Sequence, residues 1–120
     1  MGLEISTHEH GTASVIALSG ELDIYTVPAF RSALDVHDPL RSRLIVDLSE
    51  VTLLDSSGLG SLVSILNRTR EGQGQLGLVC PQRQIRRVFE ITGLRRAFVF
   101  GDDVSSVDTA LEEFSAPPAS

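Results

Sequence analysis

The sequence predicts an α/β domain: a small mixed β-sheet, mainly parallel with an antiparallel first strand, packed by about four helices. Short β-rich apolar runs alternate along the chain with longer stretches in which apolar residues recur at helical spacing. Helices that lie between apolar strands imply right-handed crossovers, and therefore parallel neighbouring strands. The 120 residues are the length of one domain. We expect it to span residues 1–114, with residues 115–120 as a flexible tail.

The first two predicted strands form a hairpin. Residues 3–6 alternate apolar and polar side chains, which is typical of an edge strand. Residues 13–18 are rich in β-forming side chains, and Gly20 closes this run. Between the two runs, residues 10–12 (His-Gly-Thr) are turn-like. A hairpin makes the first strand antiparallel to the second.

Helices and strands alternate from Thr26 onward. Thr26 resembles a helix N-cap, Pro28 suits a first helical turn, and Pro39 closes the segment. The later strands are expected at residues 44–48, 76–80 and 97–100. The four helices are expected where apolar residues recur at three- and four-residue spacing: Phe30, Ala33 and Leu34; Leu59, Leu62, Val63 and Leu66; Ile85, Val88 and Phe89; Val104, Val107, Leu111 and Phe114.

Composition and charge exclude several classes of protein. The formal net charge of −6 repels phosphate backbones, so nucleic acid is not expected as a partner. A single cysteine, Cys80, allows neither an internal disulfide nor a thiolate zinc site, and we expect no metal and no cofactor. No apolar run is long enough to span a membrane, and the first residues do not resemble a signal peptide. We therefore expect a cytoplasmic protein that does not insert into membranes.

Two polar segments follow predicted strands. They are residues 20–23 (Gly-Glu-Leu-Asp) and residues 55–60 (Asp-Ser-Ser-Gly-Leu-Gly). Functional groups of open α/β sheets collect at the carboxyl ends of the strands, where loops meet helix N-termini. If the two preceding strands are parallel neighbours, both segments share that edge of the sheet. Asp23 and Ser56 would then lie close together.

The Asp-Ser-Ser-Gly segment has two interpretations. Its aspartate or serine oxygens could cap the following helix by accepting hydrogen bonds from unpaired N–H groups, and the spacing alone favours this capping role. Alternatively, Ser56 or Ser57 could display a hydroxyl at a helix N-terminus, whose dipole accommodates an anion, and accept a phosphoryl group there. Gly58 and Gly60 could simply allow tight packing of the helix on the sheet.

The known sequence signatures of catalysis do not fit this chain. There is no lysine and no G-x-x-x-x-G-K-[ST] motif, so a P-loop is excluded. No glycine stands two residues before Ser56 or Ser57, so the nucleophile elbow of hydrolases is excluded as well. Neither of these two catalytic sites is therefore expected, and these motifs point to no catalytic residue.

Three arginines lie three and four residues apart on one predicted helix: Arg83, Arg86 and Arg87. The default interpretation is a solvated basic face. The alternative is a docking patch for an acidic partner, for which the paired donors of arginine are suited. The sequence leaves both open.

Several segments resemble one known protein family. They are residues 18–23, residues 46–48 followed by 54–60, and residues 86–89 through 92–94. In this order they resemble bacterial anti-sigma factor antagonists, the single-domain members of the STAS fold family. The resemblance runs from about residue 3 to residue 111 and is most specific in residues 55–60. It implies a small mixed sheet, with its first strand antiparallel, packed by helices.

The resemblance also implies a function and a site. Family members are not enzymes: the unphosphorylated antagonist binds an anti-sigma factor, itself a GHKL-type serine kinase, and so releases a sigma factor. Phosphorylation of the serine after the motif aspartate breaks the binding, and a PP2C-type phosphatase restores it. The implied phosphoacceptor in this sequence is Ser56. The implied partner-binding residues are Asp23, Asp55, Ser57, Gly58 and Leu59.

Two aspects of the resemblance leave alternatives. Family members often have proline at the start of the third helix, where this chain has Gln82, Arg83 and Gln84 after Pro81, so the arginine face could serve a different partner. The same motif occurs in stress-complex scaffolds and in cytoplasmic domains of transporters. The alternative function is therefore a stand-alone STAS subunit that regulates a membrane transporter.

Overall fold

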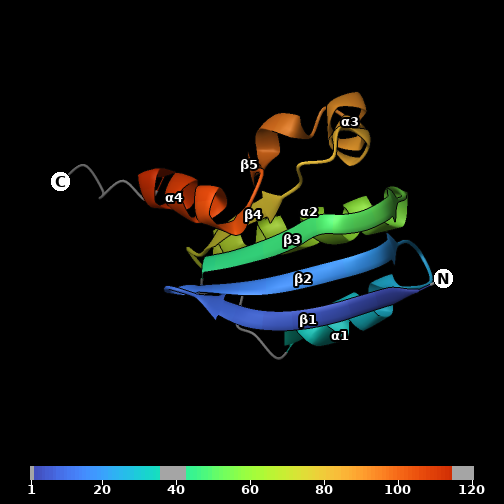
Figure 1. The fold of residues 1–120 in the computed structure, drawn as a ribbon, viewed down its shortest axis with the longest axis horizontal. Helices are drawn as coiled ribbons and strands as arrows, with labels where there is room; N and C mark the ends of the chain where they lie inside the picture. Colours follow the sequence, from blue (N-terminus) through green and yellow to red (C-terminus); the bar gives the residue numbers. More distant parts are fainter. Residues whose placement is uncertain (1, 36–42, 115–120) are drawn as a thin grey trace.

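A computed structural model describes residues 2–35 and 43–114 of the chain. Within these ranges, five strands form one sheet in the order β1-β2-β3-β4-β5 (Figure 1). The strands are β1 (Leu3–His10), β2 (Ala13–Leu22), β3 (Arg43–Leu54), β4 (Gln75–Val79) and β5 (Val99–Gly101). β1 runs antiparallel to β2, and every other neighbouring pair is parallel. The predicted fold class is confirmed.

In the described part of the chain, four α-helices and one short 3₁₀ turn connect and cover the strands. They are α1 (Val27–Asp35), α2 (Ser56–Glu71), α3 (Arg83–Ile91), η1 (Arg95–Ala97) and α4 (Val104–Phe114). The apolar side chains of α1, α2 and α3 share one large core cluster with the sheet, while those of α4 belong to a second, smaller cluster. The predicted tail over residues 115–120 and the helix stop at Pro39 lie outside the described residues.

The central strands are buried on both faces. In β3, Leu44, Val46 and Leu48 belong to the large cluster, while Ile45, which points the other way, belongs to the small one. Because successive side chains of a strand alternate between the two faces, each face must be apolar for both clusters to form. This requirement explains the nearly continuous apolar run that predicted this strand.

Several predicted strand ends were wrong. β1 extends to His10, because its eight residues each pair with a residue of β2. β2 continues past Gly20 to Leu22, because Gly20, Glu21 and Leu22 each pair with a residue of β3. Gly20 has φ 118°, and a Cβ atom there would clash with the carbonyl oxygen of Gly2. β5 begins at Val99, because Ala97 belongs to η1. Long-range pairing, rather than local composition, sets these ends.

Gln82 braces an irregular part of β3. The register between β2 and β3 shifts twice, between Ala17 and Ser19 and again between Gly20 and Glu21. The side-chain Nε2 of Gln82 donates hydrogen bonds to the carbonyl oxygens of Leu48 (2.6 Å), which lies within the first shift, and Val51 (2.9 Å), which lies just after it. Gln82 therefore satisfies buried carbonyl groups next to the irregular segment, a role that proline at the start of α3 could not perform.

α2 packs against β2 and β3 at a glycine. A Cβ atom on Gly58 would lie 2.4 Å from the carbonyl oxygen of Leu22 and 2.8 Å from a methyl group of Leu54. A Cβ atom on Gly60 would meet nothing within 4 Å. Only Gly58 therefore supports the expectation that these glycines allow close packing.

We expect Leu62→Ala to lower the free energy of unfolding by about 2–5 kcal/mol, because it empties part of a closely packed core. The Leu62 side chain is fully buried in the large cluster. Val63, on the same predicted apolar stripe, is only half-buried. Urea unfolding measures the change, with the exposed Ser64→Ala as a control that shifts stability by about 0.5 kcal/mol or less. Equal losses in the two variants would contradict the assigned packing.

Gly58→Ala and Gly60→Ala form a second, matched pair. We expect Gly58→Ala to destabilise the fold by about 1–3 kcal/mol, because the new methyl group forces backbone apart. Gly60→Ala should stabilise it by about 0.5–1 kcal/mol, because alanine loses less conformational freedom in a helix. Thermal unfolding of both variants measures the two signs. A stabilising Gly58→Ala would disprove the close approach of α2 to β2.

Candidate functional site

The two predicted polar segments meet at one edge of the sheet. β2 and β3 are parallel neighbours, and their last residues, Leu22 and Leu54, pair with each other. The backbone N–H of Asp55 donates to the carbonyl oxygen of Leu22 at 3.3 Å. The backbone N–H of Ile24 in turn donates to Asp55 Oδ2 at 3.2 Å. The prediction that both segments share this edge is confirmed.

Asp55 is the N-cap of α2. Its backbone is extended (φ −98°, ψ −176°), and its Oδ1 accepts a hydrogen bond from the N–H of Gly58 at 2.9 Å. Its carbonyl oxygen accepts the first helical bond, from the N–H of Leu59. Because the other carboxylate oxygen binds the N–H of Ile24, both oxygens are engaged. The capping role that the sequence favoured thus belongs to Asp55.

Ser56 is the first residue of α2 and is exposed. Its hydroxyl makes no hydrogen bond to any described residue. The first N–H groups of a helix lack partners within the helix and carry partial positive charge. The hydroxyl therefore lies in solvent at a position that suits an anion. The two interpretations of this segment are compatible, because Asp55 caps the helix and the hydroxyl of Ser56 remains accessible.

The loop between β2 and α1 is fixed by its own side chains. Asp23 Oδ1 accepts hydrogen bonds from the N–H groups of Tyr25 (2.9 Å) and Thr26 (3.1 Å). Thr26 Oγ1 accepts from the N–H of Asp23 and donates to the carbonyl oxygen of Glu21 at 2.7 Å. Thr26 thus precedes α1 as expected, but its hydroxyl holds the loop. The same bonds turn the Asp23 carboxylate into the loop.

The other predicted partner-binding residues lie at different depths. Ser57 is half-buried, whereas Gly58 is buried against β2. Leu59 is only 6% exposed and packs in the large core cluster. The structure thus brings Asp23, Asp55 and Ser56 together near the surface, with Gly58 and Leu59 beneath them.

Three exposed apolar side chains, which the sequence pattern did not predict, flank this site. Ile24 is 61% exposed, Tyr25 88% and Leu53 43%. Ile24 and Tyr25 follow Asp23 in the loop, and Leu53 pairs with Glu21 at the end of the sheet. In the sequence, Ile24 and Tyr25 are an apolar pair between the polar residues Asp23 and Thr26, and they do not continue the apolar pattern of a strand or a helix. Such a patch beside polar groups is typical of a protein-binding surface.

The predicted arginine cluster is divided. Arg83 and Arg87 are exposed on α3. Arg86 is half-buried: its guanidinium lies 5.6 Å from the ring centre of Phe100 and 3.4 Å from Asp102 Oδ1. Arg86 therefore contributes to packing, and only the two exposed arginines are available to a partner.

Charge is distributed unevenly along the chain. Residues 56–101 contain seven of the ten arginines but only two of the sixteen acidic residues, which gives them a formal charge of +5. The remainder carries −11. The basic side chains gather on the end of α2, on α3 and on η1, whereas the loop beside Ser56 is acidic.

The described residues contain neither a reactive thiol nor a cluster of side chains that could bind a metal ion. Cys80 is buried, and burial raises the pKa of its thiol to about 11, against a smaller lowering by Arg86. At neutral pH the thiol is therefore protonated and a poor nucleophile. No group of three or more His, Cys, Asp or Glu in residues 2–35 and 43–114 could hold a metal ion. None of the described helices is both long and apolar enough to cross a membrane.

Comparison with known proteins gives consistent relatives. The family model of the STAS domain matches residues 4–109. The anti-sigma-B factor antagonist of Listeria monocytogenes is 36% identical over 96 residues, covering 78% of this chain and 84% of that protein. The anti-sigma-B factor antagonist of Staphylococcus aureus is 34% identical over 99 residues, covering 79% and 89%.

Solved structures share the fold. A crystal structure of an anti-sigma factor antagonist from Mycobacterium paratuberculosis superimposes with a TM-score of 0.82 at 29% identity, covering 92% of this chain and 94% of that one. The unphosphorylated form of the anti-sigma factor antagonist SpoIIAA gives a TM-score of 0.73 at 21% identity, covering 91% and 97%, and shows likeness of fold alone. With its family match over residues 4–109 and relatives that are anti-sigma factor antagonists, the chain belongs to the STAS domain family.

Proposed function

We propose that this chain is an anti-sigma factor antagonist switched by phosphorylation of Ser56. Its unphosphorylated form binds an anti-sigma factor and thereby releases a sigma factor, and phosphorylation breaks this binding. The observation that carries the proposal is the exposed Ser56 hydroxyl at the start of α2, held in place by the capping Asp55 but bonded to no described residue. The names of the relatives support the partner class.

The surface around Ser56 suits a protein partner. Ile24, Tyr25 and Leu53 supply exposed apolar area beside the polar groups of Asp23 and Asp55. Aromatic and aliphatic side chains of this kind contribute most of the binding energy at protein interfaces, and a polar rim excludes water from them. The partner in this proposal is a GHKL-type serine kinase that contacts Ser56 directly, so that one surface serves both binding and phosphoryl transfer.

The antagonist itself supplies no catalysis in this scheme. The kinase adds the phosphoryl group, and a PP2C-type phosphatase removes it. All three proteins act in the cytoplasm. A chain that only presents a hydroxyl needs a rigid, accessible serine, and the hydrogen bonds of Asp55 to Gly58 and Ile24 provide that rigidity.

The switch has a simple electrostatic basis. A phosphate on Ser56 adds about −1.5 to −2 charges beside Asp55 and near Asp23. At a separation of about 6 Å and an effective dielectric constant of about 20, each pair of unit charges repels by about 3 kcal/mol. The N-terminus of α2 offsets about 1 kcal/mol of this cost, and water and salt screen most of the remainder because Ser56 is exposed, so the fold tolerates the phosphate. The phosphorylated structure of SpoIIAA, which shares this fold at a TM-score of 0.67 and 22% identity, is consistent with such tolerance.

We expect phosphorylated Ser56 and Ser56→Asp to bind the anti-sigma factor at least tenfold more weakly than the unmodified protein. A partner surface that fits a neutral hydroxyl must desolvate or repel the added charge, and a loss of about 3 kcal/mol exceeds a hundredfold in affinity. Ser56→Ala should keep binding and lose phosphorylation. Titration calorimetry measures the affinities.

The matched control is Ser64→Asp, which adds the same charge at an exposed position two turns further along α2. It should bind like the unmodified protein. Equal affinity of the phosphorylated and unmodified proteins would disprove the switch. Capture of partners with unmodified protein and with Ser56→Asp, followed by mass spectrometry, then separates this function from regulation of a transporter: a kinase lost from the second sample supports the proposal, and a permease contradicts it.

The exposed arginines of α3 provide a second contact in this proposal. We expect Arg87→Glu to slow association with the anti-sigma factor at low salt and to reduce the salt dependence of the rate, because peripheral charges act mainly on encounter. Arg31→Glu, at an exposed position of α1, is the control and should leave the rate unchanged. Stopped-flow association measures both. Equal rates for the two variants would reduce Arg83 and Arg87 to a solvated face.

A further inference from the structure

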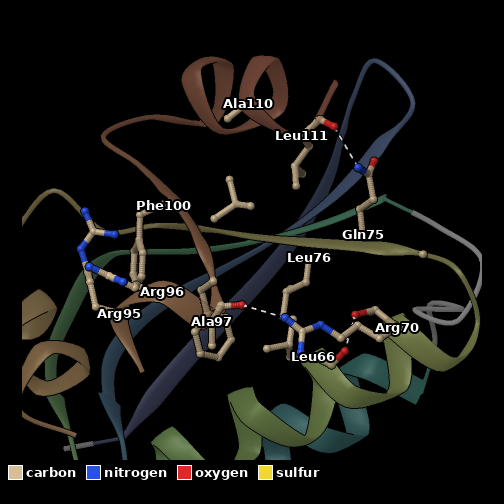
Figure 2. Close-up of a pocket in the computed structure, with 14 residues that line it drawn as sticks. Leu66, Arg70, Gln75, Leu76, Arg95, Arg96, Ala97, Phe100, Ala110 and Leu111 are labelled. Atoms are coloured by element: carbon tan, nitrogen blue, oxygen red, sulfur yellow. Dashed lines mark hydrogen bonds between the residues drawn. The ribbon is translucent and has the colours of Figure 1, made fainter. Parts of the chain in front are cut away.

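A cavity of about 480 Å³ lies far from Ser56, between the last turns of α2, the end of α4 and the edge of the sheet (Figure 2). Its volume is within the range of small-molecule binding pockets. The residues that line it lie within the ranges 66–76 and 95–111, for which the sequence predicts no function.

The short edge strand creates this cavity. β5 pairs with β4 only from Gly77 onward, so the first residues of β4, Gln75 and Leu76, have a strand neighbour on the β3 side alone. The chain before β5 forms the η1 turn instead of continuing the strand, and the N–H of Ala97 bonds back to the carbonyl oxygen of Leu94. The space that a longer β5 would fill between α2 and α4 remains open.

The floor of the cavity is apolar. Leu66 from α2, Leu76 from β4 and Leu111 from α4 converge on it from different elements, and Phe100 lies across from them (Figure 2). Gln75 closes one end through a hydrogen bond from its Nε2 to the carbonyl oxygen of Leu111 at 2.8 Å. Such walls favour an aliphatic or aromatic body.

Three arginines line the same cavity: Arg70, Arg95 and Arg96. None of them forms an ion pair with a described residue. Arg70 donates one hydrogen bond to the carbonyl oxygen of Ala97 at 3.3 Å, and the Arg95 guanidinium lies 5.1 Å from the ring centre of Phe100 (Figure 2). These contacts orient two of the guanidinium groups and leave donors free. Their positive charge is not neutralised within the described structure.

We propose that this cavity binds a small amphipathic anion, namely an aliphatic carboxylate of medium chain length. The apolar floor takes the hydrocarbon chain, and the guanidinium groups of Arg95 and Arg96 bind the carboxylate, which arginine can grip with two parallel hydrogen bonds. The basic charge of residues 56–101 adds a favourable field for an anion in a chain that is acidic overall. Apolar walls with unpaired cations at one side match this class of ligand better than a neutral or cationic one.

The proposed ligand site is independent of the Ser56 site. Arg70 lies fourteen residues after Ser56 on the same helix, which corresponds to about 20 Å at 1.5 Å per residue. A ligand in the cavity therefore does not contact Ser56. Either proposal can fail without the other.

The test uses the full chain labelled with nitrogen-15 and titrated with decanoate, with backbone amide shifts as the readout. We expect decanoate to shift the amides of residues 66–70, 75–76, 98–100 and 110–111. Decanol, which has the same chain but no charge, and acetate, which has the charge but no chain, should bind at least tenfold more weakly. Equal affinity for decanol and decanoate would overturn the assignment of an anionic ligand, and shifts confined to the Ile24 and Tyr25 loop would overturn the site.

Two variants with matched controls test the walls. The double variant Arg95→Gln with Arg96→Gln should weaken decanoate at least tenfold, while Arg31→Gln on α1 should not. Ala110→Leu, which adds three carbon atoms to a residue lining the cavity, should abolish binding without lowering the melting temperature, while Ala29→Leu on α1 should leave binding intact. Unchanged affinity in both cavity variants would overturn the proposal.

Discussion

The geometry of the exposed serine depends on one carboxylate, that of Asp55. One oxygen caps α2 through the N–H of Gly58, and the other holds the β2–α1 loop through the N–H of Ile24. The two bonds join the ends of neighbouring parallel strands to the start of a helix. Because Asp55 caps the helix, the hydroxyl of Ser56 is not needed for capping and faces solvent. A cap formed by Ser56 itself would have buried the hydroxyl in structural bonds, so the aspartate before it is what makes the serine available.

Much of this arrangement follows from local sequence. The alternation of apolar runs and helical stripes was sufficient for the element order, and the parallel pairing of β2 and β3 then brought the two polar segments together. Strand lengths were not predictable in the same way. β3 runs on to Leu54 because β2 offers partners that far. Gly20 stays inside β2 because it pairs with Val51, and the backbone of Gly2 approaches so closely that only glycine fits there. Pairing between distant segments carries this information.

Burial was the other quantity that local pattern could not supply. Val63 lies on the predicted apolar stripe of α2 yet is only half-buried, whereas Ile24 and Tyr25 are apolar yet exposed. Similarly, the run from Ala97 to Phe100 is β-like in composition, but the rings of Phe98 and Phe100 both pack edge-on against Phe89, with centroids 5.5 and 4.9 Å away. That aromatic packing belongs to the tertiary structure, and it accompanies a strand of only three residues.

The uneven placement of charge gives the molecule a permanent electric dipole moment. A dipole in the field of a charged partner experiences a torque before the surfaces touch, so the molecule turns as it approaches. Its positive charge lies on the end of α2, on α3 and on η1, and its negative charge includes the acidic loop beside Ser56 and the acidic residues around α4. A phosphate on Ser56 would add negative charge beside Asp55 and so change the moment. Phosphorylation of Ser56 would then change the orientation in which the protein approaches its partners, as well as its affinity for them.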